Sequence, residues 1–370
     1  MDIVLMIMAA FAILGLADDF IGGKLGLADS FTTAMQTTGR VIICCSGFYC
    51  IGISLVEKAA EPLARLSEVL PFEASLFLSC IASSDCGSLP VAMAMAENPA
   101  VGIFSGALVA GTLGASLGYQ FPYFISALEK KYIPVYIQGI AFGLISAPVG
   151  LIAGGLLLDM SMSELLLNTM PVAMLCLLVV VGVKLSVNRT IKVLYAVTKT
   201  VQLITYVLFA LVVADVFIPW LKICDVRLVE EISYLSLRMV LVTCGAMVLV
   251  TCGAMVMANL AVRYLGGPIR MLGRLMKVNE ESVVGLFISL FNSVGMLPLL
   301  PKMDRRGLLL NIAFSVCGAY CLGGQMAFVS SVIPGDCMPA YMVNKLAAGL
   351  TAMLIAAAFV KKTAVHAGEE

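Results

Sequence analysis

Histidine is almost absent from this sequence, and charge is scarce. The one histidine, His366, lies in the polar C-terminal tail, which excludes histidine metal sites and histidine general bases from the body of the chain. Charged residues make up 12% of the 370 residues, against about 25% in ordinary soluble domains. The net charge is zero, so there is no electrostatic case for binding nucleic acid.

Several catalytic and metal-binding patterns are also missing. The chain has no HExxH sequence and no GxxxxGK[ST] loop, so a metalloenzyme is disfavoured and ATP-driven transport would need a separate subunit. The twelve cysteines form no CxxC pairs, and most lie in apolar runs, where they act as small hydrophobic side chains. We therefore expect no enzymatic activity, no metal site and no cofactor.

Apolar residues dominate the sequence. They account for 61% of it, with a mean hydropathy of +1.03, and this predicts an all-α integral membrane protein whose surroundings are the lipid bilayer. Crossing about 30 Å of hydrocarbon takes about 20 residues. The short run Ile3–Ala17 has no basic segment before it, so we expect a retained first span rather than a signal peptide. Eight further candidates are Thr38–Val56, Val101–Phe121, Val135–Leu158, Leu165–Leu185, Val201–Phe217, Val240–Val262, Leu308–Val332 and Tyr341–Val360.

Two more apolar segments are interrupted by polar and helix-breaking residues. The run 73–82 meets Ser84-Asp85-Cys86-Gly87 before a second arm, and the run 281–291 meets Asn292-Ser293-Val294-Gly295 in the same way. Ten helical residues extend only about 15 Å. We therefore expect two half-helices meeting at mid-membrane depth in each segment, an arrangement tolerated only beside protein or a cavity.

The two interrupted segments resemble each other. An offset of 208 residues aligns Asp85 with Ser293 and Gly87 with Gly295. Short matches at similar offsets flank both segments, so we interpret the chain as internally duplicated. The predicted parts are an N-terminal span and interfacial segment (1–36), a first repeat (37–160), a connecting helix pair (161–238), a second repeat (239–362) and a polar tail (363–370).

Charges beside the interrupted segments predict their orientation. Cytoplasmic loops are enriched in lysine and arginine. Acidic residues prevail around the first segment, whereas basic residues lie on both sides of the second. The two segments would then enter from opposite faces. The predicted fold has about nine transmembrane helices plus two re-entrant, broken hairpins in inverted structural repeats. If each broken segment crosses fully, there are eleven spans and the repeats are parallel.

Asp85 is the candidate centre of a binding site. An aspartate at mid-membrane costs roughly 2.5–3.5 kcal/mol on insertion scales, and the ends of broken helices form substrate sites in transporters. With the Ser84 hydroxyl and the close approach that Gly87 allows, Asp85 would bind a cation; alternatively, it caps the second half-helix. Asn292 and Ser293 offer neutral groups at the equivalent place, or serve the turn alone.

Three polar residues interrupt other apolar spans. Gln325 follows two glycines, and Gln120 occupies a similar place in the first repeat. Each is a candidate to line the cavity, with hydrogen bonding between helices as the alternative. Lys345 lies near the start of the last span. We expect it to snorkel to the interface, with pairing to an acid as the alternative.

The sequence resembles the EutH-type ethanolamine permeases over most of its length. The resemblance rests on Asp85-Cys86-Gly87, on the stretch 148–155, and on 302–307 followed by 311–316. Two stretches depart from the family pattern. The chain has Asn292-Ser293 where the family tends to have two asparagines. It also lacks, within 323–328, the acid and the histidine that the family tends to carry.

The resemblance implies a multi-pass carrier in the bacterial cytoplasmic (inner) membrane that moves ethanolamine or a related small amine. Asp85 would bind the ammonium group, and Asn292, Ser293 and Ser84 the hydroxyl. A carrier for a different small polar or amine substrate and a non-transporting membrane scaffold or sensor subunit are the alternatives. The coupling ion and the oligomeric state, including a homo-oligomer, stay open at this point.

Overall fold

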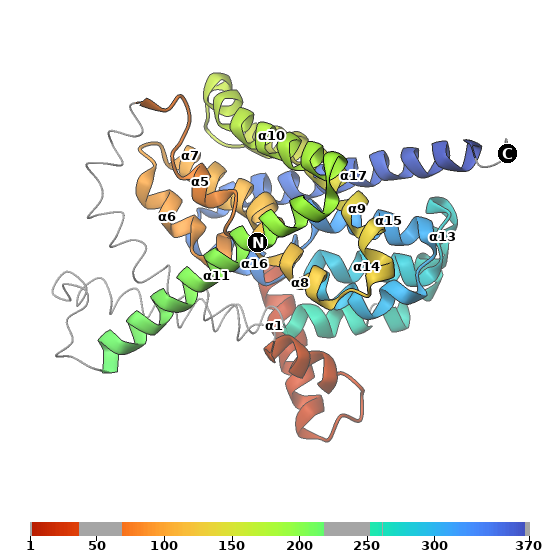
Figure 1. Ribbon diagram of the computed structural model, residues 1–370. Helices are drawn as coiled ribbons and strands as arrows, with labels where there is room; N and C mark the ends of the chain where they lie inside the picture. The colour runs from red at the N-terminus through yellow and green to blue at the C-terminus, as the bar shows by residue number, and fades with distance from the viewer. Residues whose placement is uncertain (1, 37–68, 218–251, 261, 367–370) are drawn as a thin grey trace.

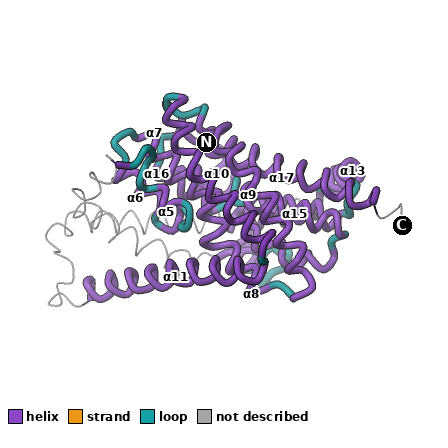
Figure 2. The backbone as a smooth tube through the Cα atoms, turned by 45° about the horizontal axis from the view of Figure 1, so that its top comes forward, coloured by secondary structure: helices purple, strands orange, loops and turns teal. Residues whose placement is uncertain are grey.

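The computed structural model describes residues 2–36, 69–217, 252–260 and 262–366. Every regular element in these residues is a helix (Figure 2), as expected for an all-α protein. In chain order the elements are α1 (Asp2–Phe20), α5 (Leu76–Ser79), η2 (Ser84–Cys86), α6 (Ser88–Met95), α7 (Pro99–Ile103), η3 (Phe104–Gln120), α8 (Phe121–Ala127), η4 (Lys130–Tyr132), α9 (Ile133–Gly155), α10 (Met162–Leu185), α11 (Val187–Phe217), α13 (Gly266–Met276), α14 (Glu280–Phe291), η5 (Ser293–Lys302), α15 (Arg305–Gly318), α16 (Gly324–Val332), η6 (Gly335–Cys337) and α17 (Met338–His366).

Five helical stretches within the described residues are long and apolar enough to cross a membrane: Pro99–Ile125, Lys130–Gly155, Met162–Leu185, Val187–Leu211 and Gly335–Val360. They support a multi-pass membrane protein. The predicted spans Thr38–Val56 and, for the most part, Val240–Val262 lie outside the described residues. The total of nine spans with two re-entrant hairpins, and its eleven-span alternative, stay predictions.

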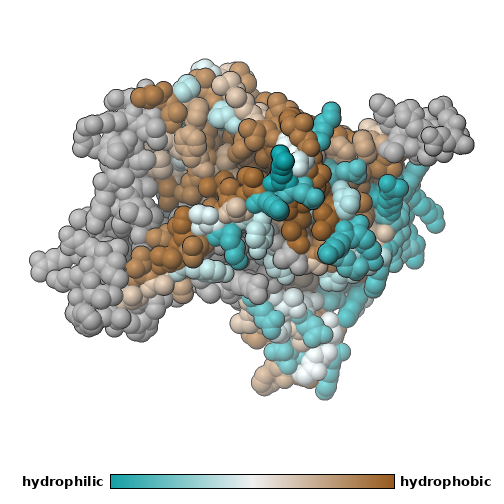
Figure 3. Space-filling view, viewed as in Figure 1, coloured by the Kyte–Doolittle hydropathy of each residue, from teal (hydrophilic) through white to brown (hydrophobic). Residues whose placement is uncertain are grey.

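These stretches differ in how deeply they are packed. The apolar window of Pro99–Ile125 is 94% buried, whereas that of Val187–Leu211 is 0% buried. Hydrophobic atoms prevail over α10 on the face shown in Figure 3, while hydrophilic atoms gather around α13. The η3 segment is therefore central. The outer helices present the apolar surface that contact with lipid requires.

The centre of the molecule is built from both halves of the chain. Helices α9, α15 and α17 pack side by side (Figure 1), and η3 lies against all three. A glycine allows one of these approaches, because a Cβ at position 150 of α9 would collide with the backbone carbonyl of Asn344 on α17. The predicted first and second repeats thus share one core.

The helices are interrupted at both predicted places. Helix α5 ends at Ser79, Ser83 is extended, and α6 begins after Gly87, whose φ is 95°. Helix α14 ends at Phe291, its C-cap residue Asn292 has φ −157° and ψ 109°, and the 3₁₀ helix η5 follows. Polar residues correctly marked the end of α14 and the start of α6, but the half-helix expected over 73–82 is only the short α5, which ends at Ser79.

Two predicted spans differ from the structure. Leu308–Val332 is not one helix, because α15 and α16 are separated by residues 319–323. This segment hydrogen-bonds to the end of α14: the Tyr320 N–H donates to the Ser289 carbonyl oxygen and the Leu322 N–H to that of Leu290. Such backbone bonds replace those of a continuous helix. The other span, Val201–Phe217, is only the second part of α11, which begins at Val187.

Candidate functional site

Asp85 lies in the 3₁₀ turn η2, between α5 and α6. The hydroxyl of Ser83 donates a hydrogen bond to Asp85 Oδ1. Gly87 turns the chain into α6 in a left-handed conformation that a residue with a Cβ adopts only at a cost. Gly87 itself is the N-cap residue of α6, without a side-chain cap. Asp85 is therefore not the N-cap residue of the second half-helix, and it remains half-buried at the break.

Gln325 reaches the Asp85 turn from the far end of the sequence. It lies in the first turn of α16, is 3% exposed, and donates from Nε2 to the Ser83 hydroxyl over 2.8 Å. Its Oε1 accepts a hydrogen bond from the hydroxyl of Tyr341, on α17, at 3.0 Å. A continuous polar chain therefore runs from α17 through Gln325 and Ser83 to the carboxylate.

Tyr320 connects the second broken segment to the same place. It has φ 61°, which is unusual for a residue with a Cβ. Its hydroxyl lies 2.6 Å from Ser293 Oγ, and its carbonyl accepts from the Tyr341 hydroxyl at 3.1 Å. The ring of Tyr119, on η3, meets that of Tyr320 edge-on, with centroids 6.4 Å apart.

Lys345 is buried in this region, so the prediction that it snorkels to the interface is wrong. Its side chain is 1% exposed. Nζ donates to the carbonyl oxygen of Gly111, on η3, at 2.6 Å and to that of Ala319 at 2.7 Å. The interruption after α15 leaves the Ala319 carbonyl outside a helix, where it offers a buried ammonium an acceptor.

The lysine also meets aromatic faces and the aspartate. Nζ lies 5.4 Å from the ring centroid of Tyr341 and 5.9 Å from that of Tyr320, within range of cation–π attraction. The charges of Asp85 and Lys345 lie close enough to interact. We call the connected group the Asp85 cluster; it consists of Ser83, Asp85, Ser293, Tyr320, Gln325, Tyr341 and Lys345.

The remaining predicted site residues fall in three places. Ser84 has a fully buried hydroxyl with no hydrogen-bond partner among the described residues, an unsatisfied group of the kind that a bound ligand relieves. Asn292 accepts a hydrogen bond from the Val294 N–H, so its side-chain oxygen serves the turn. Gln120 donates to Ser315 on α15 over 2.8 Å. That bond supports the alternative reading of Gln120 as a link between helices.

Sequence reasoning missed Tyr320 and Tyr341 as members of the cluster, and it missed the true partners of Lys345. One signal was available, because Tyr341 and Lys345 are four residues apart and therefore share one face of a helix. The carbonyl acceptors carried no such signal. They depend on how η3 and the 319–323 segment meet, which residue types alone do not specify.

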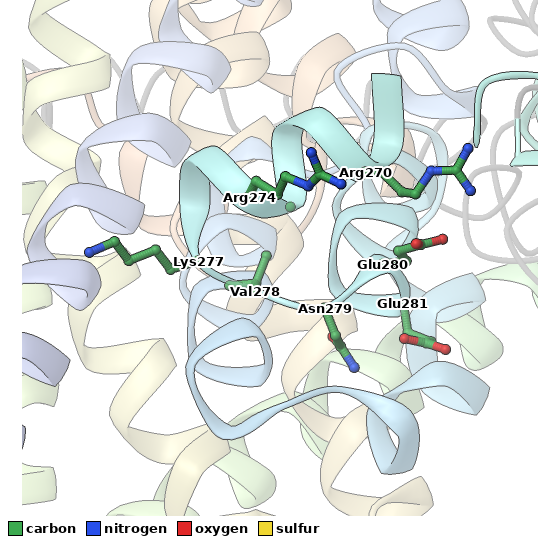
Figure 4. Close-up of a pocket in the computed structure, with 8 residues that line it drawn as sticks. Arg270, Arg274, Lys277, Val278, Asn279, Glu280 and Glu281 are labelled. Atoms are coloured by element: carbon green, nitrogen blue, oxygen red, sulfur yellow. The ribbon is translucent and has the colours of Figure 1, made fainter. Parts of the chain in front are cut away.

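A charged groove lies apart from the Asp85 cluster. It encloses about 620 Å³ between α13 and the start of α14, and Figure 4 shows arginines and a lysine of α13 together with Glu280 and Glu281 of α14. Both signs of charge line the groove, so it favours neither cations nor anions. Within the described residues, no group of three or more histidine, cysteine, aspartate or glutamate side chains is arranged to hold a metal ion.

Long apolar helices around a buried polar cluster, set at broken helices, define a multi-pass membrane protein with the internal architecture of a transporter. The chain belongs to the EutH family, described as "Ethanolamine utilisation protein, EutH", whose profile matches residues 1–359. This membership confirms the resemblance noted from the sequence. Together with the relatives described next, it also confirms the expectation of a transporter rather than an enzyme.

Three relatives illustrate the breadth of the match. A "Probable ethanolamine permease EutH" of Listeria monocytogenes serotype 1/2a (strain 10403S) is 25% identical over 354 residues, covering 96% of this chain and 92% of the relative. "Uncharacterized protein YxeR" of Bacillus subtilis (strain 168) is 26% identical, covering 96% and 94%. A "Probable ethanolamine permease EutH" of Salmonella typhimurium (strain LT2) is 24% identical, covering 98% and 96%. No solved structure matches the chain.

Proposed function

We propose that this protein is a permease for a small cationic amino alcohol, with ethanolamine as its substrate, in the cytoplasmic membrane of a bacterium. The observation that carries the proposal is the Asp85 cluster, in which a carboxylate at a helix break is connected by hydrogen bonds to the second half of the chain. Family membership and the names of the relatives point to the same substrate.

The chemistry of the cluster suits a molecule with an ammonium at one end and a hydroxyl at the other. Asp85 would accept charge-assisted hydrogen bonds from the ammonium. The phenolic groups of Tyr119 and Tyr320 lie close enough to Asp85 for electrostatic interaction. Their rings would add cation–π attraction for the ammonium. Ser293 and the unpartnered hydroxyl of Ser84 would bind the substrate hydroxyl, with Asn292 shaping the turn.

The position of the cluster suits alternating access. The hydrogen bond Gln325–Ser83 joins the two predicted repeats, and the Ser293–Tyr320 contact ties the second broken segment to the 319–323 segment within the second repeat. If the broken segments are re-entrant and enter from opposite faces, movement of either segment would open the cluster to one side. In this scheme residues 37–160 and 239–362 are the moving repeats, and 161–238 is a connecting pair.

A substrate panel tests the proposal. Binding of ethanolamine to the purified protein is compared across pH with binding of ethylamine, which lacks the hydroxyl, and ethylene glycol, which lacks the amine. The proposal predicts the strongest binding for ethanolamine, weaker binding for ethylamine, and none for ethylene glycol. Equal binding of ethylene glycol and ethanolamine would contradict an ammonium site. Binding without translocation in proteoliposomes would instead favour a scaffold or sensor subunit.

A further inference from the structure

We infer that binding of an ammonium substrate at Asp85 releases the proton of Lys345, so that the carrier exchanges a substrate cation for a proton. The net movement is then that of the neutral amine. This inference deepens the proposed function and rests on it. Nothing in the family description or in the names of the relatives assigns a role to Lys345.

Within the described residues, the surroundings of Lys345 contain one carboxyl group, that of Asp85. The groups whose charge acts on Lys345 are Asp85 from η2, Cys317 from α15 and Cys321 from the 319–323 segment. The rings of Tyr320 and Tyr341 lie beside it. Thiols and phenols are ordinarily neutral at pH 7, and neither η3 nor α9 carries a charged residue. Among the described groups, Asp85 is thus the countercharge of Lys345.

Charge balance then changes when a substrate enters. Before binding, the ammonium of Lys345 and the carboxylate of Asp85 cancel. A substrate ammonium at Asp85 leaves one surplus positive charge, and an uncompensated buried charge costs several kcal/mol. Departure of one proton from Lys345 restores neutrality without moving either side chain.

The hydrogen bonds of Lys345 permit this loss. An ammonium has three N–H groups, and two of them donate to the carbonyl oxygens of Gly111 and Ala319. A neutral amine retains two N–H groups, which suffice for the same two acceptors. Deprotonation therefore breaks neither of these two hydrogen bonds, whereas a lysine held by two carboxylates would lose its attraction on losing its charge.

The exchange balances over one cycle. The N–H bond of Lys345 breaks, its electron pair stays on Nζ, and the proton passes to water on the side from which the substrate came. The substrate keeps its own proton and is released on the opposite side, where Lys345 takes up a proton from water. One substrate ammonium moves inward and one proton moves outward, so no net charge crosses the membrane.

Calorimetry of ethanolamine binding in phosphate and in HEPES, two buffers of different ionisation enthalpy, counts the protons released. The wild type should release about one proton per bound substrate, as linkage requires if Lys345 titrates on binding. Lys345→Arg keeps the countercharge of Asp85 but cannot lose its proton, so it should bind ethanolamine more weakly and release none. The matched control is Lys131→Arg. Lys131 is 62% exposed, and this variant should behave as the wild type.

The outcomes are distinguishable. Ethanolamine binding by the wild type without proton release would overturn the inference about Lys345, but it would not contradict the proposed permease function. Release of a proton by Lys345→Arg would show that another group supplies it. No binding by the wild type would refute the proposed function, and the inference with it.

A second measurement needs no variant, in case Lys345→Arg fails to fold. Wild-type proteoliposomes receive a potassium gradient with valinomycin, which sets the membrane potential. A singly charged substrate carried alone would accumulate about 50-fold at 100 mV, since that potential is worth about 2.3 kcal/mol per charge. The inference predicts the same accumulation with and without the potential, and potential-driven accumulation would contradict it.

Discussion

The amide of Gln325 donates a hydrogen bond of 2.8 Å to the hydroxyl of Ser83, which in turn donates to Asp85. This contact joins residues 242 positions apart in the chain. It brings the start of α16 against the first broken segment and orients the hydroxyl that holds the carboxylate. The site therefore depends on the two halves of the chain being packed together.

Replacing Gln325 with leucine should weaken substrate binding. The change removes the donor to Ser83 and one of the two acceptors of the Tyr341 hydroxyl, and each lost hydrogen bond costs about 0.5–1.5 kcal/mol net. We expect the KM for ethanolamine uptake to rise about tenfold or more. Gln120→Leu is the matched control, because Gln120 bonds Ser315 between helices. It should lower the melting temperature and leave KM unchanged, and an equal rise in KM for both variants would contradict the assignment.

Tyr320→Phe should impair recognition of the substrate hydroxyl while keeping the ring. The phenolic oxygen lies 2.6 Å from Ser293 Oγ and positions it, so its loss frees Ser293 to rotate. We expect the preference for ethanolamine over ethylamine, measured as a ratio of KM values, to fall several-fold, consistent with a net value of about 1 kcal/mol for one hydrogen bond. Tyr195→Phe on α11, where the tyrosine is 42% exposed, is the control. An unchanged ratio in Tyr320→Phe would exclude this role.

Asp18→Asn should destabilise the protein at neutral pH. Asp18 follows the apolar run Ile3–Ala17, and its carboxylate accepts hydrogen bonds from three backbone N–H groups of the next loop, those of Leu25, Leu27 and Ala28. Burial raises the pKa of Asp18, but these donors and the charge of Arg263 outweigh burial and leave the pKa below its ordinary 3.8.

The pH dependence of this destabilisation follows from the direction of the pKa shift of Asp18. Because the folded-state pKa of Asp18 is depressed, its contribution to stability is present above pH 3.8 and is lost as the pH falls through the lower, folded-state value. The melting temperature of Asp18→Asn should lie below that of the wild type at pH 7, and the gap should narrow below pH 3.8. The exposed neighbour provides a control in Asp19→Asn. A gap that stayed constant with pH would refute the ionic contribution.

Much of the architecture could be predicted from residue types. Polar and helix-breaking residues in apolar runs located both interruptions, since Gly87 caps the start of α6 and Asn292 caps the end of α14. The same reasoning selected Asp85, Ser293 and Gln325, which the structure brings into one cluster. Their roles in binding stay predictions.

The rest could not be predicted because it depends on irregular backbone. By its residue types, the 319–323 segment belongs to an apolar span. The helix is broken there because the N–H groups of Tyr320 and Leu322 donate hydrogen bonds to carbonyl oxygens at the end of α14. Lys345 was expected at the interface, since a lysine near a helix end usually finds water. The Ala319 carbonyl that holds it inside is offered by that same unforeseen break.

The most direct test of the central claim is uptake of labelled ethanolamine into proteoliposomes by Asp85→Asn, beside the wild type and the exposed control Asp336→Asn. Removing the carboxylate charge forfeits a charge-assisted hydrogen bond worth about 1.5–3 kcal/mol, so uptake at low substrate should fall at least about tenfold. Asp336→Asn should transport normally. Normal uptake by Asp85→Asn at equal reconstituted amounts would contradict the account, because the substrate ammonium would then not be bound by Asp85.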